Sequence, residues 1–475
     1  MRALRVDRRD DFMQAFRRVH FIGIGGAGMS GIAEVLHTLG YTVSGSDRSD
    51  SDSVRRLRDL GVEVRIGHDP EALADADAVV VSTAIPEDNP ELLEARKRRL
   101  PVVPRAEMLG ELMRFRRGIA VAGTHGKTTT TSLVASVLAE GGLDPTYVIG
   151  GRLLAAGAHA GLGEGEWLVA EADESDGSFL KLNPVLAIVT NIDVDHLENY
   201  DGDFQRLCAA FDQFLHHLPF YGLAVLGVDD PEVRKLAAAC PRRTLTYGFS
   251  TDADVRASGV RQDGARMDFA LHLPDRDATV PVSLNLPGRH NVQNALAAAA
   301  VGWQLGVPAA AIATALGRFR GVGRRFNVLG DFLFDGARAL VVDDYGHHPR
   351  ELAAVIEAAR GGWPERRLVV VFQPHRYSRT RDLMDDFAEI LSEADVLVLT
   401  EVYPAGEAPI AKADGRALAR AVRSRGRVDP VFVAHVHELP RELPAILEDG
   451  DLLLLAGAGD IGHVARALVA PGGAR

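Results

Sequence analysis

The stretch Gly118-Ile-Ala-Val-Ala-Gly-Thr-His-Gly-Lys-Thr-Thr-Thr-Thr131 joins small apolar residues to a glycine-rich turn, a lysine and a run of hydroxyls. This order predicts a buried strand, a tight turn and the start of a helix. The backbone N–H groups of such a turn, together with the helix N-terminus, attract phosphate oxygens. ATP binding is therefore the first hypothesis, and an exposed strand–helix turn with incidental glycines is the alternative.

The predicted phosphate loop departs from the usual G-x-x-x-x-G-K-[ST] pattern, because Val121 stands where the first glycine would be. We expect Lys127 to contact the β- and γ-phosphates and Thr128 to hold a magnesium ion. The residues expected to surround the ATP phosphates are Gly123, Thr124, His125, Gly126, Lys127, Thr128 and Thr129.

The composition of the 475-residue chain restricts the class of protein. The net charge of −12 argues against a nucleic acid or an anionic membrane as partner. Two cysteines, Cys208 and Cys240, cannot form a disulfide framework. The charged N-terminus lacks the apolar core of a signal peptide, and no apolar run is long enough to span a membrane. We expect a cytoplasmic protein, a monomer or weak dimer, with about two to four domains.

Short apolar runs alternate with helical patterns along the whole chain, which is typical of parallel α/β domains. Asp263-Gly264, inside an alternating stretch, predicts a hairpin turn. Three blocks are expected, with boundaries near residues 1–116, 117–325 and 326–475. The expected strands are Val19–Ile24, Tyr41–Gly45, Ala78–Ser82, Ile119–Ala122, Trp167–Ala170, Leu186–Thr190, Leu368–Phe372, Val396–Thr400 and Leu452–Ala456.

A second glycine-rich turn, Gly23-Ile-Gly-Gly-Ala-Gly28, follows the first expected strand. It fits the dinucleotide pattern G-x-G-x-x-G, and Asp47 stands where an acid that binds ribose is expected. This turn is the best support for an NAD-dependent oxidoreductase. The physical requirement is only that a helix N-terminus meets a diphosphate, so a UDP-sugar fits equally well.

Acidic residues follow two further expected strands. Glu171 begins the acidic run Glu171-Ala-Asp-Glu-Ser-Asp176, and a carboxylate at a strand end beside a phosphate loop is a natural magnesium ligand. His196 ends the stretch Thr190-Asn-Ile-Asp-Val-Asp-His196, where a metal or phosphate role is favoured over a core histidine.

The last block carries Val341-Val-Asp-Asp-Tyr-Gly-His-His-Pro349 and Gln373-Pro-His-Arg-Tyr-Ser-Arg379. Arg376 and Arg379 lie three positions apart and are candidates for clamping a carboxylate or phosphate. Asp343 is a candidate for holding a ribose. Taken in isolation, either stretch would be interpreted as a solvated polar loop in preference to a binding site.

Together these motifs resemble the ATP-dependent Mur ligases of peptidoglycan synthesis. The resemblance also rests on Leu286-Pro-Gly-Arg-His-Asn-Val-Gln-Asn-Ala295, on Gly323-Arg-Arg-Phe326 and on the pair Asp195-His196. It runs from about Val19 to the C-terminus. Within the family, the stretches His20–Ser30, Glu171–Asp176, Asp343–Pro349 and His375–Thr380 resemble the branch that adds L-alanine to UDP-N-acetylmuramate.

The resemblance implies an α/β protein of three domains. They are a Rossmann-like N-terminal domain for the UDP-sugar, a central P-loop-type ATPase domain with a parallel sheet, and a C-terminal Rossmann-like α/β domain. It further implies that the reaction is amide-bond formation with ATP as co-substrate, Mg²⁺ as cofactor, and UDP-N-acetylmuramate and L-alanine as partners.

The resemblance also implies roles for individual residues. Catalytic roles fall to Lys127, Glu171, His196, Arg376 and Arg379, and magnesium ligation falls to Thr128, Glu171 and His196. Nucleotide contacts beyond the phosphate loop fall to Asn294, Arg325 and Asp343. The substrate-binding residues are Gly25, Gly26, Gly28, Met29, Ser30, Asp47 and Ser82 for the UDP-sugar, and Tyr345, His347 and His375 for the alanine end.

Several sister ligases carry a carbamylated lysine after the Asp-His pair as a bridge to a second metal. The corresponding position lies near Phe211, and no lysine stands between His196 and Leu226. This departure agrees with the alanine-adding branch. A sister ligase that attaches a peptide to the same sugar, the oxidoreductase and a nucleotide-gated binding module stay open as alternatives.

Overall fold

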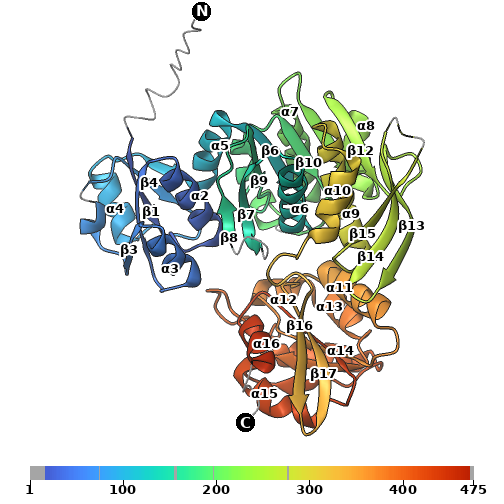
Figure 1. Ribbon diagram of the computed structural model, residues 1–475. Coiled ribbons are helices and arrows are strands. Elements are labelled where there is room, and N and C mark those ends of the chain that lie inside the picture. The colour runs from blue at the N-terminus through green and yellow to red at the C-terminus, as the bar shows by residue number, and fades with distance from the viewer. Residues whose placement is uncertain are drawn as a thin grey trace, which may run out of the picture. The chain divides into compact units, whose positions relative to one another are not determined.

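The computed structural model describes residues 16–73, 75–153, 158–195, 197–274, 276 and 278–470. The chain forms two compact units. The first comprises the residues up to 255 together with 297–312, and the second comprises 256–296 and 313–475. The fold is the expected three-domain α/β architecture with sheets rich in parallel strands (Figure 1).

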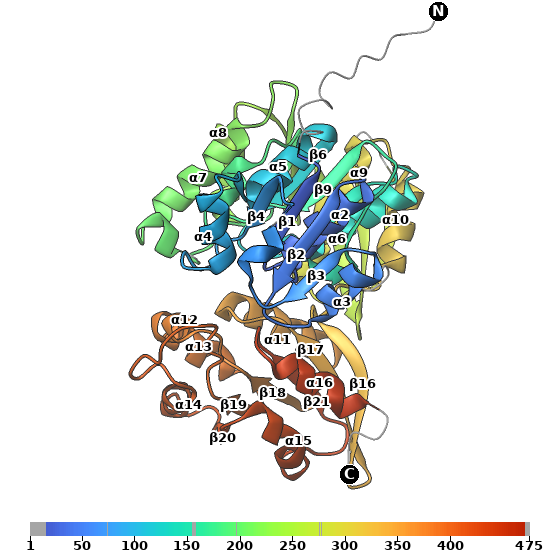
Figure 2. The same ribbon diagram turned by 90° about the vertical axis from the view of Figure 1, so that its left-hand side faces the viewer.

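The N-terminal sheet is parallel throughout and runs in the order β3-β2-β1-β4-β5 (Figure 2). Its strands are β1 (Arg18–Ile22), β2 (Thr42–Asp47), β3 (Glu63–Ile66), β4 (Ala78–Val81) and β5 (Val102–Pro104). Its helices are α2 (Ala27–Thr38), α3 (Asp52–Asp59), η1 (Pro70–Leu73), α4 (Pro90–Lys97) and α5 (Arg105–Phe115).

Both faces of this sheet are covered, as a parallel sheet requires. Phe21 packs with buried side chains of α2, α3 and α5, whereas the next residue, Ile22, packs with Leu92 and Ala95 of α4. Successive side chains of a strand point to opposite faces, so β1 contributes to both layers. The carboxyl ends of β1 and β2 meet at one edge, where the glycine-rich turn begins.

The central sheet of the first unit runs in the order β12-β11-β10-β6-β9-β7-β8. All neighbouring pairs are parallel except β7 with β8. The strands are β6 (Arg117–Ala122), β7 (Thr146–Leu153), β8 (Ala158–Gly161), β9 (Trp167–Glu171), β10 (Leu186–Val189), β11 (Leu223–Gly227) and β12 (Arg243–Gly248). The helices are α6 (Lys127–Glu140), η2 (Ser178–Lys181), η3 (Leu197–Tyr200), α7 (Phe204–His216) and α8 (Pro231–Ala239).

The order of the central strands positions the candidate site. β6 lies between β9 and β10, so the loops that follow these three strands emerge at the same edge of the sheet. The buried parts of these strands, 118–122, 168–170 and 186–189, contain only apolar residues, which suits burial on both faces.

The second unit begins with three antiparallel strands, β13 (Val255–Asp263), β14 (Arg266–His272) and β15 (Val280–Leu284). Asp263 pairs with Arg266 across the β13–β14 turn, which confirms the predicted hairpin, and Gly264 in that turn has a φ of 54°. Helices α9 (Arg289–Gln304) and α10 (Ala309–Arg318) follow; in the sequence, both cross from one unit into the other.

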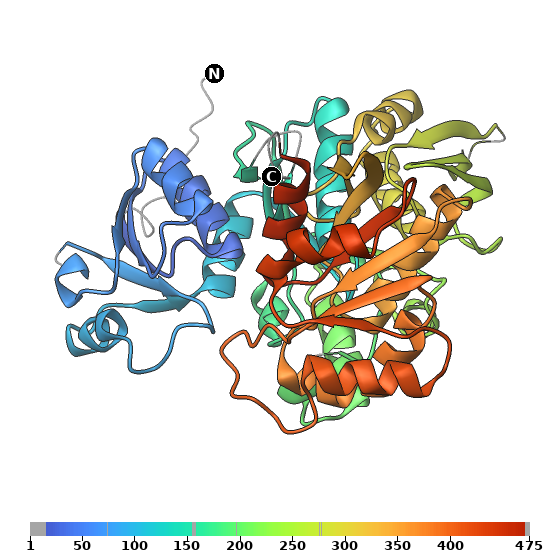
Figure 3. The same cartoon turned by 90° about the horizontal axis from the view of Figure 1, so that it is seen from below.

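The C-terminal sheet runs in the order β16-β17-β21-β18-β19-β20 and is parallel apart from β16 with β17. This part of the chain, orange to red, is seen from below in Figure 3. Val370 and Phe372 of β18 pack on the face covered by α11, α13 and α14, and Val369 and Val371 on the face covered by α15 and α16. The strands are β16 (Asn327–Phe334), β17 (Ala337–Asp344), β18 (Leu368–Phe372), β19 (Val396–Thr400), β20 (Val431–Val433) and β21 (Leu452–Ala456). The helices are α11 (Pro349–Gly362), α12 (Tyr377–Asp382), α13 (Met384–Leu391), α14 (Gly415–Ser424), η4 (Val436–Glu438), α15 (Leu439–Glu442), η5 (Leu443–Ala445) and α16 (Ile461–Val469).

Each expected strand is present, with ends that differ by no more than two residues from the expected ones. Among the described residues, no helix is long and apolar enough to cross a membrane.

A close approach of backbone at Gly110 gives a test of the packing in the first unit. A Cβ at this buried position of α5 would lie 2.6 Å from the carbonyl oxygen of Lys181. We expect Gly110→Ala to lower the free energy of unfolding by about 1–3 kcal/mol, because backbone must shift to relieve the contact. Urea unfolding followed by circular dichroism measures the change.

The matched control is Gly317→Ala in α10, where the nearest atom to an added Cβ is the Ser283 carbonyl oxygen at 3.3 Å. Gly317 is exposed, so the greater helix propensity of alanine should leave stability unchanged or raise it by up to about 1 kcal/mol. Equal destabilisation by both substitutions would contradict the packing account.

Candidate active site

The phosphate loop connects β6 to α6 and depends on two glycines in the left-handed region. Gly126, the N-cap of α6, has a φ of 82°. Gly123 has a φ of 131°, and a Cβ there would lie 2.0 Å from Oγ1 of Thr190. Side chains rarely adopt these backbone angles, and no side chain fits beside Thr190. The local conformation therefore explains why glycines occupy both positions.

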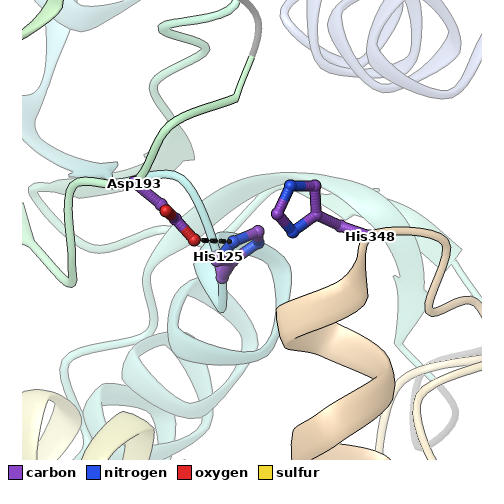
Figure 4. A group of neighbouring side chains, drawn as sticks. All are labelled: His125, Asp193 and His348. Carbon is purple, nitrogen blue, oxygen red and sulfur yellow. Dashed lines mark hydrogen bonds and ion pairs between the residues drawn. The ribbon is translucent and has the colours of Figure 1, made fainter. Parts of the chain in front are cut away.

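The loop that follows β10 holds the phosphate loop in place. Asn191 Oδ1 accepts the His125 N–H at 2.9 Å, and Asn191 Nδ2 donates to the His125 carbonyl at 3.0 Å. Thr190 Oγ1 donates to the same carbonyl, and the Asp193 N–H donates to Thr124 Oγ1 at 2.8 Å. His125 Nε2 lies 3.1 Å from Asp193 Oδ2, the contact drawn dashed in Figure 4. The strand-end cluster predicted around Asp193 thus supports the phosphate loop directly.

Lys127 is largely buried and is held by oxygen atoms. Its Nζ donates to the carbonyls of Gly123 and Thr124 and lies 2.8 Å from both carboxylate oxygens of Glu174. Burial alone would lower the pKa of Lys127, but the carboxylates of Glu174 and Asp173 outweigh this effect and raise it. Lys127 is therefore positively charged, as contact with phosphate requires.

A cavity of about 330 Å³ links the two glycine-rich turns of the first unit. It brings together the predicted UDP-sugar residues Gly26, Gly28, Met29 and Ser82 with Lys127 and Glu171 of the predicted ATP site. The remaining lining residues are Arg105, Leu109, Val148, Ile149 and Asp173.

Other predicted UDP-sugar residues support the first turn. Asp47 Oδ2 accepts the Gly25 N–H at 2.8 Å, and its Oδ1 accepts the Ser49 N–H at 3.1 Å. Gly25 has no room for a side chain, since a Cβ would lie within 2.9 Å of Asp47, Ser51 and Val54. The Ser30 N–H donates to the Gly26 carbonyl as part of the first turn of α2.

Two residues were not predicted from the sequence: Arg105, which lines the cavity, and Glu174, which contacts the lining residue Lys127. Arg105 Nη1 would lie 2.7 Å from a Cβ at Gly28, and Arg105 Nη2 lies 3.5 Å from Asp173 Oδ2. No sequence pattern marks Arg105, because it stands at the start of an ordinary helix. Glu174 had a signal, since it belongs to the acidic run after β9, but the run alone did not indicate which acid pairs with Lys127.

The predicted magnesium ligands are partly placed. Glu171 ends β9 and pairs in register with Val121 of β6, beside the phosphate loop. Thr128 is the second residue of α6 and is buried. Both offer oxygen atoms, the donor type that Mg²⁺ prefers. His196 lies outside the described residues.

The position that carries a lysine in sister ligases lies in the hydrophobic core. Phe211 is fully buried, and its ring meets Phe179 edge to face at 5.3 Å. Phe179 also stacks on Phe214 at 5.0 Å. Phe211 therefore offers no ligand atom to a second metal.

In the second unit, acidic and basic side chains meet where β17 ends. Asp343 Oδ1 lies 3.5 Å from Arg324 Nε, and burial raises the pKa of Asp343. Asp344 accepts the N–H groups of Phe326 and Gly346, and burial raises its pKa to about 6. Asp344 was not predicted; it fixes the turn that carries the predicted residue Arg325.

The predicted alanine-end residues form a row of rings. Tyr345 lies 5.3 Å from His347, His347 lies 5.7 Å from His375, and His375 stacks on Tyr403 at 5.5 Å. Burial lowers the pKa of both imidazoles to about 4, so both are neutral near pH 7. The Tyr345 ring also lies under the guanidinium of Arg325, at 5.2 Å.

Arg376 stands at the N-terminus of α12 with a φ of 69°, and Arg379 lies one turn further along. Glu407 Oε1 lies 3.9 Å from Arg376 and accepts the Ser378 hydroxyl. Earlier in the chain, on α9, Asn294 Nδ2 donates to Asn291 Oδ1 at 3.2 Å. The clamp predicted for the two arginines and the nucleotide role of Asn294 stay predictions.

Comparison with known proteins gives three family models that match the chain in order. The "Mur ligase family, catalytic domain" model matches residues 18–117, the "Mur ligase middle domain" model 121–302, and the "Mur ligase, glutamate ligase domain" model 324–459.

Similar proteins cover nearly the whole chain. The UDP-N-acetylmuramate–L-alanine ligase of Xanthomonas campestris pv. campestris is 66% identical over 469 residues, and that of Xanthomonas oryzae pv. oryzae is 66% identical over 466 residues. Each alignment covers 98% of this chain and 98% of the relative.

Solved structures agree. The UDP-N-acetylmuramate-alanine ligase of Thermotoga maritima is 31% identical with a TM-score of 0.80, covering 95% of this chain and 98% of that one. A murein peptide ligase from Psychrobacter arcticus is 25% identical with a TM-score of 0.70 and the same coverage. With the three family models, these likenesses confirm the resemblance read from the motifs: the chain belongs to the Mur ligase family.

Proposed function

We propose that this chain is the ATP-dependent ligase that joins L-alanine to UDP-N-acetylmuramate, giving UDP-N-acetylmuramoyl-L-alanine, ADP and phosphate. One observation of the molecule carries the proposal. A single cavity is lined by Gly26 and Gly28 of one glycine-rich turn and by Lys127 and Glu171 of the phosphate loop region. A UDP-sugar whose diphosphate lies at the first turn thereby has its acid end near the charged groups expected to meet ATP.

The chemistry follows from these two anions. A carboxylate oxygen of the sugar's lactyl group attacks the γ-phosphorus of ATP, the bond to the bridging oxygen breaks, and ADP leaves. The amine of alanine then attacks the acyl carbon, an amide bond forms, and phosphate leaves with the former carboxylate oxygen. Bringing two anions together requires positive charge that is already in place. Lys127 supplies it from the phosphate loop, and Arg105 supplies more at the cavity wall.

Magnesium fits the residues present. Thr128 and Glu171 offer oxygen donors beside the phosphate loop, and His196 is the third ligand carried over from the family resemblance. The ion would neutralise charge on the phosphates. Residues of the chain do the remaining work: N–H groups at the start of α6 would bind phosphate oxygens, and Asn191 fixes the loop by accepting the N–H groups of Thr124 and His125.

Residues of the second unit are proposed to receive alanine. The amine that attacks must be uncharged, and His347 and His375 are neutral near pH 7, so they do not repel an incoming ammonium group. Arg376 and Arg379 offer guanidinium groups for the alanine carboxylate. Asp343, Arg325 and Asn294 are proposed to contact the nucleotide. We expect the enzyme to act in the cytoplasm, where ATP and its nucleotide-sugar substrate are available.

The alternatives explain fewer residues. An NAD-dependent oxidoreductase uses the first glycine-rich turn but leaves Lys127, Glu171 and the phosphate loop without a role. A ligase that attaches a peptide to the same sugar shares both turns. The alanine-adding relatives are 66% identical, whereas the murein peptide ligase is 25% identical, which favours alanine.

The reaction can be tested by measuring ADP release with UDP-N-acetylmuramate while the amino acid or peptide is varied. We expect ADP release to require both the sugar nucleotide and an amino acid, with L-alanine preferred to a tripeptide. Preference for the tripeptide would support the sister ligase. ADP release without either substrate would contradict ligation altogether.

Lys127→Ala should distinguish the proposed ATP site from the proposed UDP-sugar site. We expect ligation to fall at least about a hundredfold, because a buried charge that faces the transferred phosphoryl group is lost. Binding of UDP-N-acetylmuramate, measured by calorimetry, should change less than about threefold. Equal loss of both would count against separate sites.

A control is needed because Lys127→Ala leaves the Glu174 carboxylate buried without its partner, which destabilises proteins. The double variant Lys127→Ala/Glu174→Gln removes both charges. It should recover thermal stability lost in the single variant but not ligation.

Asn191→Ala tests support of the phosphate loop by a residue that does not face the cavity. Both side-chain hydrogen bonds to His125 disappear, and we expect the KM for ATP to rise about tenfold or more as the loop loses its fixed geometry. The KM for the sugar nucleotide should hardly change. Asn183→Ala, at an exposed position, is the matched control and should alter neither KM.

A further inference from the structure

A carboxylate with no role in the proposed reaction lies buried in the N-terminal domain. Glu91, the second residue of α4, has no exposed surface. Its Oε2 accepts the hydroxyl of Ser46 at 2.5 Å, and its Oε1 accepts the Asp69 N–H at 3.0 Å. Two imidazoles lie near the same Oε2, with His20 Nε2 at 3.5 Å and His68 Nδ1 at 3.4 Å.

Glu91 and its partners come from four separate parts of the domain. His20 is in β1, Ser46 is in β2, His68 and Asp69 follow β3, and Glu91 is in α4. His68 Nδ1 also lies 2.9 Å from Ser46 Oγ. Glu91 therefore connects the middle of β1, the end of β2 and the segment after β3 to helix α4.

Glu91 is held in its charged form. Burial alone would raise its pKa, but His20, the Ser46 hydroxyl and the Asp69 amide outweigh burial, and the pKa of Glu91 lies below its usual range. A buried charge is retained only when hydrogen bonds compensate the loss of water, and an apolar residue at such a position is often at least as stabilising. The network is therefore expected to serve more than stability.

Ser46 connects this network to the glycine-rich turn. Its carbonyl oxygen accepts the Gly23 N–H at 2.8 Å and the Ile24 N–H at 3.0 Å. The next residue, Asp47, accepts the Gly25 N–H. The side chain of Ser46 is thus fixed by Glu91 while its carbonyl fixes the start of the turn, and Ser46 itself is completely buried.

We propose that Glu91 is a positioning residue for the UDP-sugar: through Ser46 it sets the orientation of the Gly23–Gly28 turn that receives the diphosphate. The inference rests on the proposed function, which places the UDP-sugar at this turn. Glu91 does not line the cavity, so its effect on the ligand passes through the Ser46 hydroxyl and carbonyl. A displacement of amide groups by a fraction of an ångström weakens their hydrogen bonds to phosphate oxygens.

The test is Glu91→Gln, which keeps the size of the side chain but removes its charge and replaces one acceptor oxygen by an NH₂ group. We expect the KM and the Kd for UDP-N-acetylmuramate to rise about tenfold. The KM for ATP and kcat at saturating sugar nucleotide should stay within about twofold. Melting temperature is recorded for every variant.

The matched control is Asp77→Asn, at the opposite end of β1. Asp77 accepts the backbone N–H and a guanidinium N–H of Arg18, so it ties the start of the strand without contacting the glycine-rich turn. It should leave both KM values unchanged. A Glu91→Gln protein with a lower melting temperature but a normal KM for the sugar nucleotide would overturn the inference, as would an equal rise of both KM values.

Ser46→Ala tests the proposed route and remains informative if Glu91→Gln does not fold. It removes the hydroxyl and leaves the backbone carbonyl, so we expect a rise in KM for the sugar nucleotide alone; an unchanged KM would overturn the inference. In a double-mutant cycle, the Glu91→Gln effect should largely vanish in the Ser46→Ala background.

Binding of UDP-N-acetylmuramate by the wild-type protein distinguishes failure of the proposed function from failure of the inference about Glu91. Its absence would overturn the proposed function, and the inference with it. Normal binding by the wild type and by both variants would overturn the inference alone.

Discussion

The ammonium group of Lys127 is surrounded by oxygen atoms, and the arrangement of the first unit follows from keeping it there. Two of these atoms are carbonyls of its own loop, and two belong to Glu174 after β9. The loop in turn is fixed by Asn191 after β10. β6 lies between β9 and β10 and is parallel to both, so the segments that follow these two strands flank the phosphate loop. The strand order therefore matters to the chemistry as much as the loop sequence does.

The chain has two glycine-rich turns, and the glycines that precede their helices differ in backbone conformation. Gly26, before α2, has extended angles, with φ −61° and ψ 143°, whereas Gly126, before α6, is left-handed with a φ of 82°. At Gly126 glycine is required by the backbone angle itself. At Gly28 the Arg105 guanidinium lies where a Cβ would project, so a side chain there would displace it. The first turn also contains a left-handed glycine, Gly23 with a φ of 76°, and in the second turn a Cβ at Gly123 would lie 2.0 Å from Thr190 Oγ1, so backbone angle and packing act in both turns.

Local sequence predicted what local interactions decide. The strands, the hairpin at Asp263-Gly264 and the helix after Lys127 follow from periodicity and turn residues within a short window. Pairings across long sequence separations were not predicted. Lys127 and Glu174 are 47 residues apart, and Arg105 and Asp173 are 68 apart. No sequence pattern marks Arg105, and the acidic run that contains Glu174 does not single out this residue. Which acid of the run Glu171–Asp176 meets the lysine depends on the strand order, which one sequence does not specify.

Buried polar groups at the two ends of the C-terminal sheet differ in how completely the protein itself satisfies them. Asp451, at the start of β21, accepts two hydrogen bonds from Arg367 and is almost fully buried. It needs no further partner. Asp343 is equally buried at the other end of the same sheet. Its Oδ1 accepts no hydrogen bond from the described residues, and Nδ1 of His375 has no hydrogen-bond partner among them. An unsatisfied buried polar atom costs folding free energy of about 1–3 kcal/mol. The proposal that substrate contacts the carboxyl end of this sheet requires polar atoms with bonding capacity left over, and among the described residues Asp343 and His375 keep such atoms whereas Asp451 does not.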